Sequence, residues 1–234
     1  MAERILPKPD TFAVGPPEDV SILEHYAGTF EAVYVSLDPF LDCSEIGTQV
    51  FRPGTYPSRT FIAKNCRPIS WAEVAQRTGL PSIAAVDVGL RTSIHGLKPE
   101  FANSDYAKRI ESLAESAQIL SPDEGRFSDL LHDSVLSSIQ SLGYEWVWVG
   151  DEFGTERKLY WIDDLKNQDS GPTGGHSNVF TPDKALLWTT HWDSHFSFLC
   201  SSRSNLVRIL ESQCFEGFFC EADTEVYWSV RPAG

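Results

Sequence analysis

The segment Thr189–Cys200, "TTHWDSHFSFLC", contains the side chains best suited to chemistry, His191, Asp193 and His195, at alternate positions. Alternate side chains share one face of a β-strand, and two imidazoles with one carboxylate form the ligand set of non-haem iron sites and of many zinc sites. Along an extended strand the three positions span roughly 13 Å, so a bend is needed before they can hold one ion. One hypothesis is therefore a metal-dependent enzyme that uses His191, Asp193 and His195, with His176 as a further ligand.

The same letters also predict a β-hairpin with Trp192-Asp193-Ser194 at its tip. Aspartate and serine favour turns, and apolar runs on both sides are typical of paired strands. The tip lacks glycine or asparagine, which the tightest hairpins prefer. We favour the hairpin, and we therefore assign no catalytic residue, no metal and no cofactor.

Other catalytic motifs are absent from the sequence. It has no G-x-S-x-G elbow, and the glycine-rich segment "GPTGGH" departs from both phosphate-binding patterns. Five cysteines form an odd count without a C-x-x-C pair, which indicates reduced and mostly buried thiols.

The charge balance narrows the possible partners. Nineteen basic residues against 33 acidic residues give a net charge of −14, which repels nucleic acids and anionic lipid. The N-terminal residues do not resemble a secretory signal, and no stretch approaches the roughly 20 apolar residues of a membrane helix. We expect a cytoplasmic protein that binds neither nucleic acid nor membrane, and its oligomeric state stays open.

Acidic residues near tryptophans form the candidate interaction surface. Carboxylates steer a basic protein partner, and exposed aromatic rings then supply contact area. We predict partner binding by Asp151, Glu152, Trp161, Asp163, Asp164, Trp192 and Asp193.

Hydrophobic spacing and capping residues predict helices mainly in the first 143 residues. Ser70 and Glu73 form a capping box, and Gly79 with Pro81 ends that helix. Ser82 begins another helix that carries Ile83, Val86 and Leu90 on one face. Further helices are expected near Ile22–Tyr26 and over 104–118, 127–142 and 205–213.

Strands are predicted mainly after Gly143, which ends the last of the helices expected in the first 143 residues. The predicted segments are 145–150, 158–164, 185–192, 195–200, 215–220 and 225–230, with earlier strands at 33–37 and near Thr60–Ala63. The fold class that follows is α+β, with an N-terminal helical layer packed on a mainly antiparallel C-terminal β-sheet. We expect a single domain over 1–234, comprising an irregular arm (1–18), a mainly helical part (19–143) and a mainly β part (144–234).

Several motifs resemble an uncharacterised bacterial family recorded only as a domain of unknown function. They are "VYVSLDPFLD", "SWAEVAQRTGL", and the hydrophobic–Thr–Thr–His strand that leads through Asp193 to a Glu-Gly-Phe strand. The C-terminal half is also similar to immunity-like proteins of bacterial toxin systems. This second resemblance implies a non-catalytic protein that covers the active site of a toxin.

The leading interpretation is thus a non-catalytic cytosolic interaction protein, immunity-like, whose acidic and aromatic surface binds a basic protein such as a toxin. The metal-dependent enzyme is one alternative. The other is a small-molecule-binding domain whose pocket lies between the helical layer and the tryptophan-rich sheet.

Overall fold

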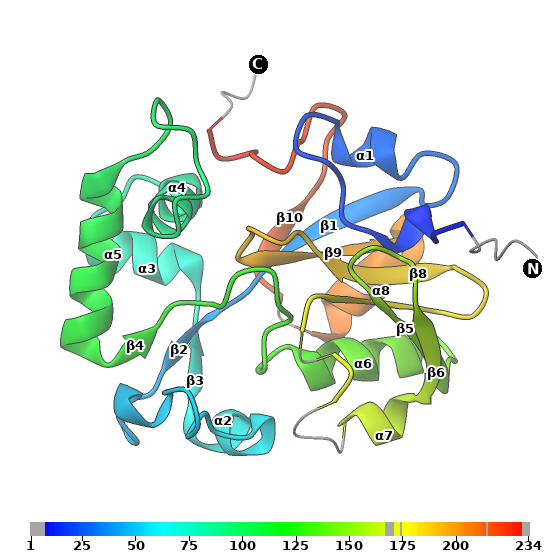
Figure 1. Ribbon diagram of the computed structural model, residues 1–234, viewed down its shortest axis with the longest axis horizontal. Helices are drawn as coiled ribbons and strands as arrows, with labels where there is room; N and C mark the ends of the chain where they lie inside the picture. Colours follow the sequence, from blue (N-terminus) through cyan, green and yellow to red (C-terminus); the bar gives the residue numbers. More distant parts are fainter. Residues whose placement is uncertain (1–7, 167–170, 174, 214, 231–234) are drawn as a thin grey trace, which may run out of the picture.

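A seven-stranded antiparallel sheet lies at the centre of the computed structural model, which describes residues 8–166, 171–173, 175–213 and 215–230 (Figure 1). Its strand order is β10-β1-β9-β8-β7-β5-β6. These strands are β1 (Ala32–Leu37), β5 (Trp146–Asp151), β6 (Arg157–Trp161), β7 (Ser177–Phe180), β8 (Leu186–Thr190), β9 (Phe196–Ser201) and β10 (Gly217–Phe219). The sheet confirms the α+β class and its antiparallel character. It also recruits β1 from the part of the chain that we expected to be mainly helical.

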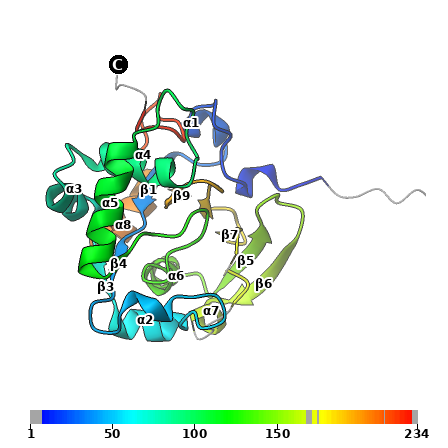
Figure 2. The ribbon, with the colours of Figure 1, turned by 60° about the vertical axis from the view of Figure 1, so that its left-hand side comes forward.

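Helices cover both faces of this sheet rather than one. They are α1 (Ile22–His25), α2 (Arg59–Asn65), α3 (Trp71–Thr78), α4 (Ile83–Ser93), α5 (Ser104–Ala117), α6 (His132–Ser141), α7 (Ile162–Lys166) and α8 (Arg203–Ser212), with 3-10 turns at Thr11–Ala13 and Thr48–Val50. Figure 2 shows α3, α4 and α5 grouped together, with α2, α6 and α7 gathered along another side.

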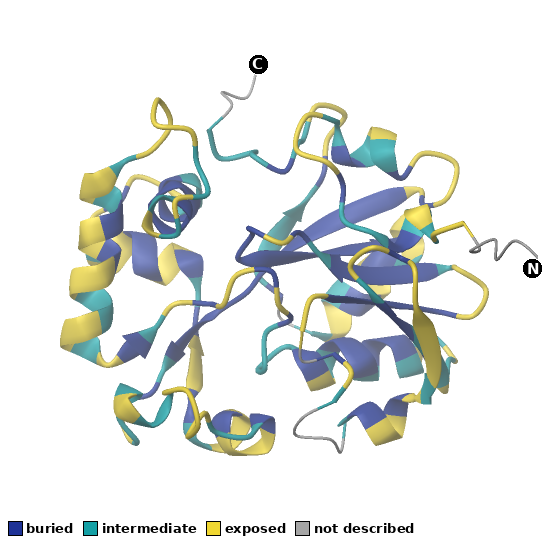
Figure 3. Ribbon diagram, in the orientation of Figure 1, coloured by how far each residue is buried: buried dark blue, intermediate teal, exposed yellow. Residues whose placement is uncertain are grey.

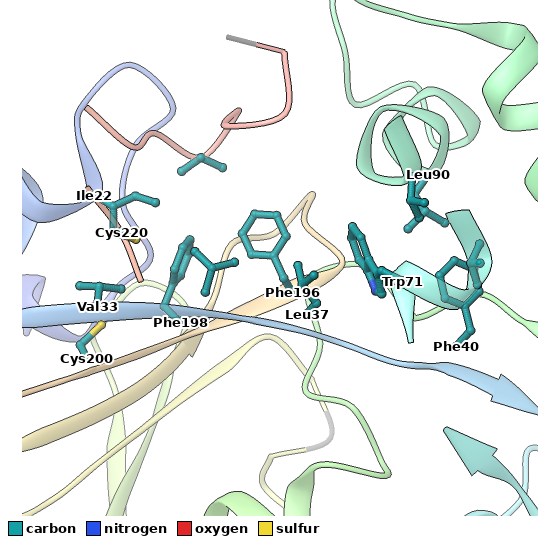
Figure 4. Close-up of a cluster of buried hydrophobic side chains, with 14 of the residues drawn as sticks. Ile22, Val33, Leu37, Phe40, Trp71, Leu90, Phe196, Phe198, Cys200 and Cys220 are labelled. Carbon is teal, nitrogen blue, oxygen red and sulfur yellow. The ribbon is translucent and has the colours of Figure 1, made fainter. Parts of the chain in front are cut away.

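The two faces of the sheet carry separate hydrophobic cores. Val33, Val35 and Leu37 pack with α1, α3 and α4 in one core, while Trp188 and Leu199 pack with α6, α7 and α8 in the other. All six residues of β1 are therefore buried, as are those of β9 (Figure 3). Figure 4 shows the first core, where Phe196 and Phe198 of β9 lie between Ile22 and Trp71.

A second, three-stranded sheet continues from the first. It has the order β3-β2-β4, built from β2 (Phe40–Asp42), β3 (Arg67–Ile69) and β4 (Ile119–Leu120). Only Asp38 and Pro39 separate β1 from β2, so the chain passes directly from the large sheet to the small one at this point. Proline supplies no backbone N–H for a ladder, which accounts for the break. Asp38 therefore lies at the junction of the two sheets.

The start of α3 shows how far-separated segments are tied together. The Ser70 hydroxyl accepts a hydrogen bond from the Glu73 N–H (3.1 Å), as the capping box predicts. The Glu73 carboxylate, however, bonds Arg77. The carboxylate of Glu216 instead accepts hydrogen bonds from the N–H groups of Trp71 (2.6 Å) and Ala72 (2.9 Å). A carboxylate at a helix N-terminus also favours the helix dipole.

Three predicted strand segments are wrong. Residues 60–63 lie in α2, because Ser58 caps this helix by accepting the Phe61 N–H and Ile62 faces the core at helical spacing from Cys66. Residues 162–164 begin α7. The segment 225–230 is irregular, because its polar groups bond to side chains of other segments rather than to a neighbouring strand.

The described cysteines confirm the expectation of buried, unbridged thiols. Cys43, Cys66, Cys200 and Cys220 are all free and buried, and the Sγ atoms of Cys43 and Cys66 lie 3.2 Å apart. Burial raises the pKa of each of these thiols, which keeps them protonated and unreactive. The structure does not describe Cys214, Gly174 of the glycine-rich segment "GPTGGH", or residues 167–170 before that segment. No helix in the described ranges has the length and apolar character needed to cross a bilayer.

Candidate functional site

The "HWDSH" segment is the connection of a β-hairpin. β8 and β9 pair antiparallel up to Thr190 and Ser197, and residues 191–195 join them. The hairpin prediction is therefore confirmed, with a five-residue connection in place of the three-residue tip. His191 directly follows β8 and His195 directly precedes β9, so the two histidines do not alternate along one strand.

The two histidines of this connection have different partners. His191 Nδ1 contacts the carboxylate of Asp193, whereas His195 Nδ1 donates a hydrogen bond to the carbonyl of Pro122 (2.9 Å). His176 lies against Gly125, next to the Trp192 carbonyl of the connection. Within the described ranges, no three histidine, cysteine, aspartate or glutamate side chains are grouped so that they could hold a metal ion. The connection thus has the geometry of a packed polar loop.

Arg91 of α4 explains why this loop is polar and buried. Its guanidinium bonds Asp87 (3.0 Å), the Ser194 hydroxyl (3.0 Å) and the Val226 carbonyl (2.9 Å), and it pairs with Asp193 at 3.4 Å. The Tyr227 ring lies under the guanidinium, and the Tyr227 hydroxyl donates to Asp193. Burial tends to raise the pKa of Asp193, but its contacts with His191 and Arg91 hold that pKa below its usual range. This network joins α4, the hairpin connection and the C-terminal segment.

The predicted interaction surface is divided by the structure. Asp193 is buried in the Arg91 network and is unavailable to a partner. Trp161 pairs with Trp146 at one end of β5, while Asp151 pairs with Ser177 at the other. The two ends, Trp146 and Asp151, are five residue steps apart, which corresponds to roughly 17 Å of strand.

The exposed members of the surface therefore form two groups. Trp161 (43% exposed) lies with Asp163 and Asp164 at one end. Trp192 (60% exposed) lies beyond Thr190, at the end that also carries Asp151 and Glu152. The prediction of exposed tryptophans holds for both rings. The seven residues do not form one continuous face.

A different site lies where the two sheets meet. We use the name polar cleft for two adjoining cavities, of about 620 Å³ and 140 Å³, whose walls share Tyr56, Asp123, Arg126, Phe127 and Asp129. The larger cavity is also lined by Arg59, His132 and Thr173, and the smaller one by Asp38, Phe51 and Ser128. The larger volume is within the range of small-molecule pockets.

The segment between β4 and α6 supplies most of the shared walls (Figure 1, green). The backbone of Gly125 holds this segment to the hairpin connection: its N–H donates to the Ser194 carbonyl (2.8 Å), and its carbonyl accepts from the Thr190 hydroxyl. Phe127 stacks on Trp188 with ring centroids 3.6 Å apart. The cleft wall is thus anchored on the sheet core. At the mouth, Tyr56 is 47% exposed and its hydroxyl donates to Asp129 at 3.4 Å.

Asp38 is the most unusual group of the cleft. Its backbone is fixed, because its N–H donates to the His195 carbonyl and its carbonyl accepts from the Trp71 indole N–H (2.7 Å). Its side chain is 1% exposed, and its Oδ1 has no hydrogen-bond partner among the described residues. Burial, together with repulsion from Asp123, raises the pKa of Asp38 well above its usual range. Burial and Asp123 also raise the pKa of Asp129.

His132 forms the back of the larger cavity. Its Nε2 lies 2.8 Å from the Thr173 hydroxyl and its Nδ1 lies 3.1 Å from the Asp133 carboxylate. Burial lowers the pKa of His132, so its ring is neutral at physiological pH. Such an imidazole can accept or relay a proton at the cavity wall. Arg59 is held nearby, donating to the Leu165 carbonyl at 2.7 Å.

Sequence patterns missed most of the cleft residues. Asp38, Arg59, Asp123, Arg126, Asp129 and His132 come from separate segments that only the tertiary fold brings together. Asp38-Pro39 was visible merely as the end of a strand. The useful signal was that this aspartate directly follows a mainly apolar strand, where burial of the side chain is expected.

The fold and the cleft define an α+β protein with a polar cavity at the junction of two antiparallel sheets. The chain belongs to the family described as "Protein of unknown function (DUF2711)", whose model matches residues 18–230. It is similar to "Uncharacterized protein YwbB" of Bacillus subtilis (strain 168), with 19% identity over 216 residues, 90% of this chain and 96% of that protein. No solved structure matches the chain. The expectation of an uncharacterised family is confirmed.

Proposed function

We propose that this protein is a small-molecule-binding domain and that the polar cleft is its binding site. The observation that carries the proposal is the pair of adjoining cavities, in which a buried carboxylate oxygen of Asp38 lacks a hydrogen-bond partner among the described residues. A buried polar group without a partner costs free energy, which a ligand that supplies the partner recovers. This cleft lies at the junction of the two sheets, whereas the expected pocket lay between the helical layer and the tryptophan-rich sheet.

The lining favours a ligand with polar groups. Carboxylates and guanidinium groups lie in the same walls as Tyr56 and Phe127, so charge and aromatic surface are both available. Small-molecule sites commonly combine an apolar wall with a few placed polar groups. The neutral imidazole of His132 adds a group that exchanges protons with a bound molecule.

A thermal-shift screen tests this function, using small amines, amino acids, carboxylates, sugars and nucleosides. The variant Arg126→Trp fills the wall shared by both cavities, and Arg208→Trp on α8 is the matched control at an exposed position. We expect at least one compound to stabilise the wild type and Arg208→Trp but not Arg126→Trp. Equal stabilisation of all three proteins, or of none, contradicts the proposal.

The second candidate function is binding of a basic protein through Trp161, Asp163 and Asp164. Its supporting observation is the 43% exposure of Trp161 on the edge strand β6, beside two exposed aspartates. An immunity-like role, in which the partner is a toxin, is the narrower form of this candidate. The unbridged cysteines support a cytoplasmic location for either function. Loss of a co-purifying basic protein on Trp161→Ala, but not on Arg126→Trp, is the result expected from this candidate.

A further inference from the structure

The smaller cavity of the polar cleft has a floor lined by carboxyl groups. Asp38, Asp123 and Asp129 line it, against the single guanidinium of Arg126 within its described lining. Arg126 pairs with Asp123 at 3.9 Å and is about half exposed, so its charge lies toward solvent. Asp38, by contrast, is buried at the sheet junction. Burial raises the pKa of Asp38, and a cation bound beside it favours its ionised form.

Aromatic rings surround the same cavity. Phe51 and Tyr56 meet edge to face with centroids 5.5 Å apart, and Phe127 is held by its stacking on Trp188. Rings of this kind attract cations through their π faces, most strongly where water is excluded. A buried carboxylate within an aromatic wall is the combination that recognises an organic ammonium group. The volume of about 140 Å³ is sufficient for such a head group and a short alkyl chain.

A metal cation fits this cavity less well than an ammonium group. Across the described residues, no three histidine, cysteine, aspartate or glutamate side chains are grouped so that they could hold one ion. An ammonium group needs only one close carboxylate, because its remaining charge is stabilised by ring faces and by hydroxyl or carbonyl oxygens. Ser121 and Ser128 belong to the same lining.

We propose that the smaller cavity binds the ammonium group of an amine ligand, with Asp38 as its buried counter-ion. This inference rests on the proposed function and names the chemical class of its ligand. The ammonium N–H donates to the Asp38 carboxylate, whose Oδ1 has no hydrogen-bond partner among the described residues. The larger cavity, with Arg59, His132 and Thr173, receives the rest of the molecule.

Isothermal titration with three probes of matched size tests the inference: n-butylammonium, 1-butanol and butanoate. We expect the full-length protein to bind n-butylammonium and to bind the neutral and anionic probes at least tenfold more weakly. Asp38→Asn, which keeps the shape of the side chain, should weaken n-butylammonium binding roughly ten- to a hundredfold. Tyr56→Leu, at an exposed position, should weaken it roughly three- to tenfold. Glu115→Gln on α5 is the matched control and should bind as the wild type does.

The outcomes separate this inference from the function on which it rests. One outcome is that Arg126→Trp abolishes binding of the compounds, but the compounds are neutral or anionic and bind Asp38→Asn as they bind the wild type. The amine inference then fails, and the binding site stands. If Arg126→Trp abolishes the binding of no compound, both fail. Equal binding of n-butylammonium to wild type and Asp38→Asn also overturns the inference. Tyr56→Leu keeps the test decisive should Asp38→Asn not fold.

Discussion

Replacing Arg91 by alanine should be the most destabilising single change outside the hydrophobic cores. The side chain is fully buried, and its guanidinium serves two carboxylates, a hydroxyl and a backbone carbonyl. Arg91→Ala leaves Asp87 and Asp193 buried without their cation. Removing one partner from a buried ion pair costs about 3–5 kcal/mol. For a chain of this length, each kcal/mol lowers the melting temperature by about 2–4 °C, so the expected loss is roughly 6–20 °C.

Arg77→Ala supplies the control for this prediction. Arg77 pairs with Glu73 one turn away on α3, but both side chains are partly exposed. Such a pair contributes at most about 1 kcal/mol. Urea unfolding of both variants, followed by tryptophan fluorescence, gives the two free energies. A loss for Arg91→Ala no larger than that for Arg77→Ala would refute the view that the network holds α4, the hairpin connection and the C-terminal segment together.

Three further predictions concern the cap of α3, the Gly125 contact and Asp38. Glu216→Gln should lower the free energy of unfolding by about 1 kcal/mol, because a charged N-terminal cap becomes neutral, and urea unfolding measures the loss. Gly125→Ala should lower the free energy of unfolding by more than about 2 kcal/mol, and the melting temperature with it, because φ at Gly125 is +62° and a Cβ there would meet the Trp192 carbonyl. Gly143→Ala is the control, because Gly143 also has a positive φ but no atom lies within 4 Å of its Cβ position. Because the raised pKa of Asp38 means that the folded state binds its proton more tightly, stability should fall as pH rises from about 4 through that raised pKa. Asp38→Asn should flatten this dependence in melting curves, while Asp123, Asp129 and Arg126, which line the same cavity, are left in place. An unchanged pH profile would contradict the assignment.

Capping residues and hydrophobic spacing predicted most of the helices and strands whose positions depend on neighbouring residues in the sequence. Ser70 with Gly79 marked α3 to the residue, and the apolar runs around Asp193 marked β8 and β9. The patterns failed where tertiary contacts decide the structure. Residues 225–230 alternate like a strand, yet the Val226 carbonyl is taken by Arg91 and Trp228 packs on Phe218.

The candidate site was less predictable, since it depends on contacts between distant segments. The sequence placed Asp193 on a surface, but its cation, Arg91, is 102 residues away and buries it. Asp38 and Asp129 become neighbours of one cavity only after β1 enters the sheet and the segment before α6 folds back over the junction. The spacing of residues along the sequence does not indicate that these two side chains will line the same cavity. The exposure of Trp161 and Trp192, which depends less on distant contacts, was predicted correctly.

Mapping amide NMR shifts during titration with n-butylammonium tests the central claim most directly. If the polar cleft is the binding site, the largest shifts should fall on Asp38, on Tyr56 and on residues 121–129, while α8 and the Trp161 end of the sheet stay unchanged. The absence of shifts at those residues would contradict amine binding in the cleft. Shifts that gather around Trp161, Asp163 and Asp164 would favour the protein-binding surface.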